Sequence, residues 1–366
     1  MRTGPKPADS LDVKAVVGSP VAAFSAVYLV AVLAASATRV FTSIQHEAGH
    51  DVPLLLGSLV AALGSFGGFI IAEADLPVGQ ISFTLAAVPF VLTGLAAVIL
   101  FHAHRRSEST RPHWESADRL LAAASSGMVL LICCLAAWFV ADSTTSPDGP
   151  EMTTNLFLLA AGALAVGTIS AAAGRESAHR ANPAWLFTFR HVLATGLVPA
   201  IVLCTAATIT REYGAASWMF VGNIAAAIWA GIHGGLVHWR FDLSPIGGPS
   251  ESGTDLLVAM RGGAWPFICL AVGAIAVIIA SIAWRRHCAE SGRWCLPVAF
   301  MCGSVIVLAA GVWASGHVRV GADATHLSAY ALYSPINVPI MGAIGWAIDR
   351  LARLGYRSED AVQPQR

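Results

Sequence analysis

The sequence predicts an all-α fold: a polytopic integral membrane bundle of about ten transmembrane helices, forming one membrane domain over residues 1–366 with short polar tails at 1–16 and 351–366. Three observations predict it. Apolar runs recur near the length of about 20 residues that a helix needs to cross a hydrocarbon core about 30 Å thick. Charged residues make up only 12% of the chain, against about 25% in soluble proteins. The alternating pattern of a membrane β-barrel is absent from the sequence, so helices are expected to satisfy the backbone in lipid.

Each expected helix is an apolar run bounded by polar residues. The runs cover residues 17–42, 53–73, 81–103, 120–141, 154–173, 190–210, 217–239, 263–285, 296–316 and 329–350. The first is too long for a signal-peptide core and is expected to be retained. The longest connection, 241–262, is rich in Ser, Pro and Gly at 244–249, which predicts a turn-rich, mobile loop. Pro335 and Pro339 predict a kinked or unwound start of the tenth helix.

Composition also bears on location and partners. Arginine outnumbers lysine twenty to two, which indicates a high-GC bacterial source and hence a bacterial plasma (inner) membrane. The expected partners are the lipid bilayer and either other membrane proteins or a homo-oligomer, and no nucleic acid is expected. Arginines in the loops of one side and in both tails leave the orientation open. Cys288 and Cys295 could face water together, as a disulfide or as two free thiols.

The sharpest local motif is HEAGH at residues 46–50, which fits HExxH and resembles the zinc motif of membrane metallopeptidases. On a helix the motif places His46 and His50 on one face, with the glutamate as general base. Pro53 biases the residue before it away from helix, which favours a turn between the first two spans. In that second interpretation the stretch is a polar loop, with Asp51 as the N-cap of the next helix.

Histidines gather on one side of the ten-span topology. His233 lies just inside that side, which holds His46, His50, His102, His104, His113, His179, His191, His238, His317 and His326. Imidazoles beside carboxylates can bind a divalent metal or exchange protons near pH 7. The most plausible metal ligands are His46 and His50, completed by His317, Asp323 or His326 from the ninth connection. Ordinary interfacial histidines are the alternative explanation.

The expected membrane interior is almost uncharged, which argues against a proton pump or a carboxylate-based cation antiporter. Its notable polar residues are Asn223 and His233 on the seventh run and Asn337 on the tenth. We predict that these three line a substrate path. Ordinary helix packing with a hydrogen-bonded histidine is the alternative.

Three hypotheses of function follow. The first is transport or binding of a small neutral or amphiphilic molecule through the helical bundle. The second is a membrane-embedded, metal-dependent enzyme, a hydrolase or an oxidoreductase, with a histidine-rich site at one membrane face. The third is a non-catalytic subunit or assembly factor of a membrane complex. Metal analysis separates the second hypothesis from the others, and stoichiometric co-purifying partners would support the third.

Overall fold

The computed structural model describes residues 12–38, 54–67, 70–76, 79–86, 88–110, 116–144, 151–179, 183–210, 218, 220–242, 244, 249–256, 264–289, 291–308, 312–320 and 323–360. The chain divides into two compact units. Unit 1 comprises Met1–Asp75 and Val91–Ala181, and unit 2 comprises Leu76–Phe90 and Asn182–Arg366. The prediction of a single membrane domain stays a prediction.

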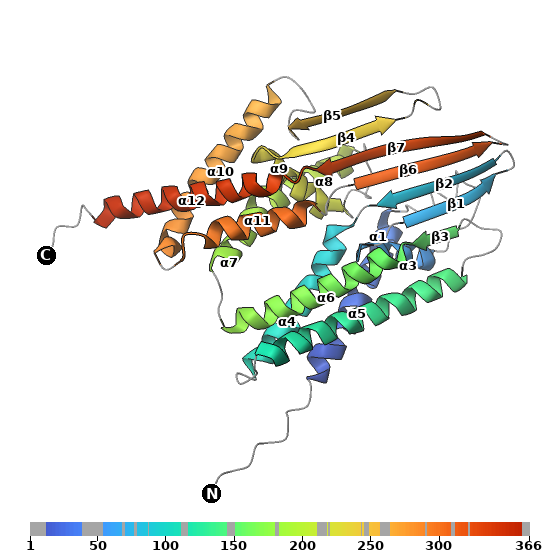
Figure 1. Cartoon of the computed structure of the whole chain (residues 1–366), viewed down its shortest axis with the longest axis horizontal. Coiled ribbons are helices and arrows are strands. Elements are labelled where there is room, and N and C mark those ends of the chain that lie inside the picture. Colours follow the sequence, from blue (N-terminus) through green and yellow to red (C-terminus); the bar gives the residue numbers. More distant parts are fainter. Residues whose placement is uncertain are drawn as a thin grey trace, which may run out of the picture. The chain divides into compact units, whose positions relative to one another are not determined.

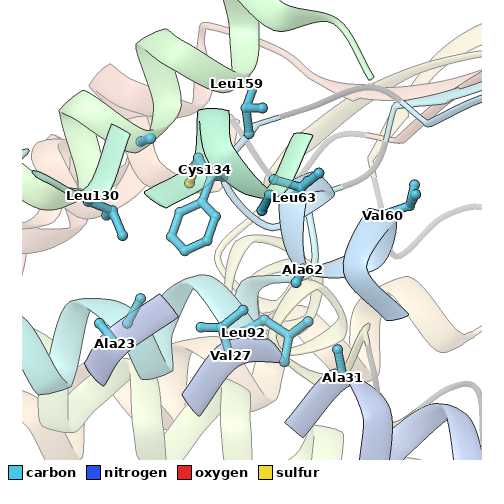
Figure 2. Close-up of a cluster of buried hydrophobic side chains, with 14 of the residues drawn as sticks. Ala23, Val27, Ala31, Val60, Ala62, Leu63, Leu92, Leu130, Cys134 and Leu159 are labelled. Carbon is cyan, nitrogen blue, oxygen red and sulfur yellow. The ribbon is translucent and has the colours of Figure 1, made fainter. Parts of the chain in front are cut away.

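Unit 1 is mainly helical, and each of its α-helices contributes to one apolar core. Its described elements are η1 (Lys14–Gly18), α1 (Ser19–Thr38), α3 (Leu54–Gly64), β1 (Ile70–Leu76), α4 (Phe90–Ser109), α5 (Ser116–Thr144), β3 (Glu151–Thr154) and α6 (Leu156–His179). Figure 2 shows Val27, Leu63, Leu92, Leu130 and Leu159, one from each of α1, α3, α4, α5 and α6, in this core. β1 pairs with β3 in antiparallel register.

Unit 2 combines helices with a sheet. Its described elements are β2 (Gly79–Ala86), α7 (Pro183–Val192), η2 (Leu193–Leu197), α8 (Val198–Thr210), α9 (Val221–Ile232), β4 (Leu236–Asp242), β5 (Ser250–Leu256), α10 (Trp265–Cys288), α11 (Cys295–Leu308), β6 (Val312–Val320), β7 (Asp323–Tyr333) and α12 (Asn337–Asp360) (Figure 1). Large side chains fill its helical core, among them Trp229, Trp284, Phe300, Met341 and Ile348.

The strands of unit 2 form an antiparallel sheet in the order β2-β6-β7-β4-β5. β6 and β7 make the longest ladder, from Val312 opposite Ala331 to Val320 opposite Asp323. β4 lies between β7 and β5, and it begins three residues after His233. The sheet is therefore joined directly to the helical part of the same unit.

The helical membrane character is confirmed in part. Five helices of the described chain are long and apolar enough to cross a membrane, by length and composition: Lys14–Ser36, Ser116–Ser143, Leu156–Ala178, Pro183–Thr210 and Pro266–Cys288. They match the first, fourth, fifth, sixth and eighth predicted runs. The count of about ten spans is not confirmed.

The other five runs correct the all-α prediction, because each joins a helix to a strand. The runs 53–73, 217–239 and 296–316 each begin in a short helix, α3, α9 or α11, and continue into β1, β4 or β6. The runs 81–103 and 329–350 begin in β2 or β7 and continue into α4 or α12. The number of apolar residues in a run does not give its length in space, because a residue advances 1.5 Å in a helix and about 3.3 Å in a strand. Hydropathy alone cannot separate these two conformations in a short run.

Several local predictions have outcomes as well. Pro335 precedes α12 and Pro339 lies in its first turn, at the junction with β7 rather than in a broken transmembrane helix. Cys288 and Cys295 are free thiols. Most of the Pro- and Gly-rich loop, 245–248, lies outside the described residues, although β4 and β5 flank it as the arms of a hairpin.

Candidate functional site

Two histidines of unit 2 meet in a buried position. His191 lies in the last turn of α7, and His233 follows the last residue of α9. Their Nε2 atoms are 3.3 Å apart. The two residues are only 8% and 6% exposed. We call them the histidine pair.

The backbone around the histidine pair departs from regular helix on both sides. The π-helix η2 begins two residues after His191, and such bulges are frequent at functional sites. α9 ends at Ile232, and Gly234 has a φ of 78°, which lets the chain turn towards β4. α10 approaches this turn through Gly273, where a Cβ atom would fall on the carbonyl group of Ile232. These features fix the position of His233 relative to α7.

Aromatic rings surround the histidine pair. The Phe187 ring stacks on His191 at a centroid distance of 6.5 Å, and the Phe300 ring lies 5.4 Å from the same imidazole. Trp229 packs edge-on against His233 at 6.1 Å. These surroundings keep water away and so strengthen electrostatic interactions at the imidazole nitrogens.

Two polar groups beside the histidine pair are buried without a hydrogen-bond partner among the described residues. They are the hydroxyl of Thr188 and the indole N–H of Trp229. Thr188 precedes His191 by three residues and therefore shares its helix face. A Cβ atom on Gly303 would lie 3.3 Å from the Trp229 ring and 3.8 Å from the Thr188 methyl group, so both side chains lie against the same part of α11. Leaving such a group unsatisfied costs about 1–3 kcal/mol, which a bound ligand could offset.

Hydrogen bonding assigns the protons of the histidine pair. Nδ1 of His233 lies 2.7 Å from the carbonyl oxygen of Trp229. A carbonyl only accepts, so Nδ1 carries the proton and Nε2 presents a lone pair. Metal-binding histidines are usually oriented by a hydrogen bond of this kind. In the absence of an ion, the Nε2–H group of His191 donates to Nε2 of His233.

The spacing of the histidine pair fits a metal ion. Two bonds of about 2.0–2.1 Å at a tetrahedral angle separate their ligand nitrogens by about 3.3 Å. The observed Nε2 to Nε2 distance is also 3.3 Å. Among the described residues, no group of three or more His, Cys, Asp and Glu residues could hold a metal. The remaining ligands would therefore be a hydroxyl, water or substrate.

The two asparagines predicted to line a path hold backbone segments together. Asn223 on α9 donates to the Val88 carbonyl at 2.9 Å and accepts from the Phe90 N–H at 3.1 Å. Asn337, at the start of α12, accepts from the Leu236 N–H at 2.8 Å and donates to its carbonyl at 2.9 Å. Both terminal amides are thus engaged by the backbone. Of the three predicted lining residues, His233 is the one that faces another ionisable side chain.

The predicted metal ligands separate into three groups. His46 and His50, with the HExxH motif, lie outside the described residues. His317 on β6 and His326 on β7 are direct register partners, so the structure places these two positions opposite each other. Asp323 is the register partner of Val320, three residues from His326, and it belongs to the opposite face of the sheet.

A second buried polar cluster ties together three helices of unit 1. Arg175 on α6 donates through Nε to Nδ1 of His104 at 3.0 Å and through Nη1 to Glu108 at 2.9 Å. Arg119 on α5 contacts the other carboxylate oxygen of Glu108 at 3.0 Å. Glu108 and Arg175 are each 1% exposed. Two arginines therefore neutralise one deeply buried carboxylate, and we call this set the ionic cluster.

His104, on α4, is neutral in the ionic cluster. Because Arg175 can only donate, Nδ1 of His104 accepts, and its Nε2–H group donates to Ser126 at 3.1 Å. Burial first, and then the neighbouring Arg175 guanidinium, lower the pKa of His104 from 6.5 to about 4. Asp12 and Glu108 oppose this shift.

Sequence reasoning missed the pairing of these groups rather than the groups themselves. His191 and His233 were placed near the same membrane face, but they are 42 residues apart and no local spacing joins them. The spacing of four between His104 and Glu108 puts both on one face of α4, and that signal was available. Treating 104–119 as a loop between spans obscured it.

The fold and the site define a class: a mainly helical protein with several apolar helices compatible with a membrane, a β-sheet in one unit and a buried histidine pair beside it. No protein family, curated protein or solved structure matches the chain.

Proposed function

We propose that the chain is a multi-pass protein of a bacterial plasma membrane that binds a transition-metal ion in unit 2, through His191 and His233. The observation that carries the proposal is the 3.3 Å spacing of the two Nε2 atoms, with Nδ1 of His233 held by a backbone carbonyl. Imidazole nitrogens suit zinc, copper, iron and nickel.

The site has the character of an open metal centre. Two histidines supply only part of the three or four ligands of a zinc-like ion. The unpartnered Thr188 hydroxyl supports a weak third contact, and the position left over is available to water or to a small molecule. Open positions are typical of catalytic metal sites, where the ion activates water or polarises a substrate. We therefore favour the metal-dependent enzyme hypothesis over simple transport.

The backbone hydrogen bonds of Asn223 and Asn337 also favour the enzyme hypothesis over transport. Transport along the seventh and tenth predicted spans depended on Asn223, His233 and Asn337, and two of these are occupied by backbone hydrogen bonds. A small neutral or amphiphilic molecule remains a suitable substrate for a metal ion in an aromatic environment. The lipid bilayer is the proposed surrounding, with a homo-oligomer or membrane partners as further proposals.

Metal binding can be tested on the full chain purified in detergent. Elemental analysis should find a transition metal, and Co²⁺ titration should give visible absorption bands of a low-symmetry site. His191→Phe keeps an aromatic ring but removes the ligand nitrogen, and we expect it to weaken Co²⁺ binding by at least about 100-fold. Losing only a hydrogen-bond partner of a metal-binding histidine already lowers metal affinity by about 10–100-fold.

The matched control is His287→Phe, which removes an exposed histidine of α10 in the same unit. It should leave both the absorption bands and the affinity of the pair unchanged. Equal binding by wild type and His191→Phe would contradict the proposal, as would absence of metal uptake by a well-folded wild type. Thr188→Val tests the hydroxyl separately, and it should weaken binding less than loss of His191.

A further inference from the structure

One end of unit 2 joins the last turn of α10, the turn that follows it and the second half of α12. α12 runs alongside α11 (Figure 1). Nη2 of Arg353 donates to the Ser291 carbonyl at 2.8 Å, which ties α12 to the turn between α10 and α11. The indole N–H of Trp284 donates to Asp349 at 2.9 Å, which ties α12 to α10 itself. We call the segments 284–289, 291–297 and 345–355 the arginine-rich end.

Exposed arginines give this end its charge. Arg286 lies in the last turn of α10, Arg293 in the following turn and Arg350 on α12, and all three are exposed. None of the three forms an ion pair with a described residue. The carboxylate of Asp349 is buried, and Arg353 neutralises it at 2.7 Å. The surface of the arginine-rich end therefore carries positive charge that no described carboxylate offsets.

Two exposed tryptophans lie at the arginine-rich end as well. Trp294 in the turn is 72% exposed, and Trp346 on α12 is 53% exposed. Trp346 and Arg350 are four residues apart and share a face of α12. A Cβ atom on Gly345 would lie 3.0 Å from the Leu296 carbonyl, so this part of α12 lies beside the start of α11. Exposed indole rings near arginines are typical of the headgroup level of a membrane, where the ring contacts acyl chains and the N–H meets polar groups.

The arginine-rich end is continuous with a helix that is suited to lipid. Pro266–Cys288 of α10 is one of the helices of the described chain long and apolar enough to cross a membrane. Ile275, Ile279 and Ile282 are each more than half exposed, at spacings of four and three. They form one apolar stripe that suits acyl chains. The arginines begin where this stripe stops, so they lie where a bilayer presents its phosphate groups.

We infer that the arginine-rich end binds the headgroups of anionic phospholipids, with Arg286, Arg293 and Arg350 contacting the phosphates. The planar guanidinium group donates two parallel hydrogen bonds to phosphate oxygens. The negative charge of such lipids complements the unpaired arginines, and each basic residue near an anionic membrane surface strengthens binding by about fivefold. This inference rests on the membrane placement in the proposed function and not on its metal site.

Tryptophan fluorescence of the full chain in a neutral detergent tests the inference. Phosphatidylglycerol with brominated acyl chains quenches the tryptophans that it contacts, and brominated phosphatidylcholine of the same chain length is the comparison lipid. Wild type should be quenched at lower concentrations of phosphatidylglycerol than of phosphatidylcholine. In Arg286→Gln/Arg293→Gln/Arg350→Gln, the midpoint for phosphatidylglycerol should rise about 100-fold, towards that of phosphatidylcholine. Thermal unfolding checks that this variant, which changes only exposed residues, stays folded.

The matched control is Arg240→Gln, which removes an exposed arginine of β4 that is already bonded to Asp242 at 2.9 Å. It should leave the midpoint unchanged, and Arg286→Lys/Arg293→Lys/Arg350→Lys, which keeps the charges, should stay closer to wild type than the Gln variant does. Trp294→Phe/Trp346→Phe should abolish the part of the quenching that is specific to phosphatidylglycerol. If that part persisted, the lipid would bind elsewhere and the inference would be overturned.

The remaining outcomes separate this inference from the proposed function. Equal quenching of wild type by the two lipids would overturn the inference and leave the metal site standing, because Co²⁺ binding to the histidine pair is measured separately. Loss of the chain from bacterial membranes in an alkaline carbonate wash would instead overturn the membrane placement itself.

Discussion

Replacing Glu108 by Gln should destabilise unit 1 strongly, because Glu108 is the carboxylate that both arginines of the ionic cluster share. It contacts Arg175 at 2.9 Å and Arg119 at 3.0 Å. Gln keeps the shape but removes the charge, which leaves two cations beside a neutral amide. Removing one partner of a buried ion pair costs about 3–5 kcal/mol.

The loss converts to a thermal shift. A change of 1 kcal/mol moves Tm by about 2–4 °C for units of this size, so Glu108→Gln should lower Tm by about 6–20 °C. The assay is thermal unfolding of the detergent-purified chain, followed by circular dichroism and by loss of the monodisperse peak. Adding Arg175→Met to Glu108→Gln removes one stranded cation, so the double variant should lose less than the sum of the two single variants.

The matched control for Glu108→Gln is Asp118→Asn, which removes the same charge from an exposed position in the first turn of α5. Its effect should stay within about 0.5 kcal/mol, as for most surface substitutions. A Glu108→Gln shift no larger than that of Asp118→Asn would refute the reasoning, because it would mean that the buried carboxylate contributes no more than an exposed one.

Three further predictions concern other parts of the structure. Because the pKa of His104 is lowered, this residue contributes stability that is present above pH 6.5 and is lost as the pH falls towards 4. The Tm of the wild type should therefore fall more steeply between pH 6.5 and 4 than the Tm of His104→Gln, and parallel curves of Tm against pH would contradict this. Gly273→Ala should weaken Co²⁺ binding at the histidine pair, because the added Cβ displaces the Ile232 carbonyl beside His233, whereas Gly94→Ala, where a Cβ meets nothing within 4 Å, should not. Asn337→Leu leaves the Leu236 N–H without its side-chain acceptor and should cost about 1–3 kcal/mol in thermal unfolding, and an unchanged Tm would show that this bond does not stabilise unit 2.

The predictable part of the fold is the part where one conformation fills a whole apolar run. The run 120–141 is continuous helix and the run 154–173 is helix from Leu156 on, and length alone identifies both helices. The run 217–239 defeats the same rule, because Gly234 turns the chain and the residues beyond it pair with β5 and β7. Strand pairing depends on partners far along the chain, which no local window contains.

The candidate site shows the same division. His233 stands out in the sequence as a polar residue in an apolar run, and it was predicted to be functional on that basis. Its partner His191 belongs to another helix, and the 3.3 Å contact arises only when α7, α9 and α10 pack together. The register that places His317 opposite His326 is likewise a property of the folded hairpin.

The order of segments along the chain constrains how the protein is made. Every residue of unit 1 precedes residue 182, but unit 2 begins with Leu76–Phe90 and resumes only at Asn182. During synthesis from the N-terminus, β2 must therefore wait for β6, and the Val88 carbonyl must wait for Asn223, 135 residues later. Until α12 arrives, the Leu236 N–H also lacks the Asn337 side chain. A ribosome stalled between Ala181 and β6 would thus hold a chain whose first unit can be complete while the edge of β2 that pairs with β6 is still open to other chains. Chaperone or insertase dependence should therefore be concentrated in that interval.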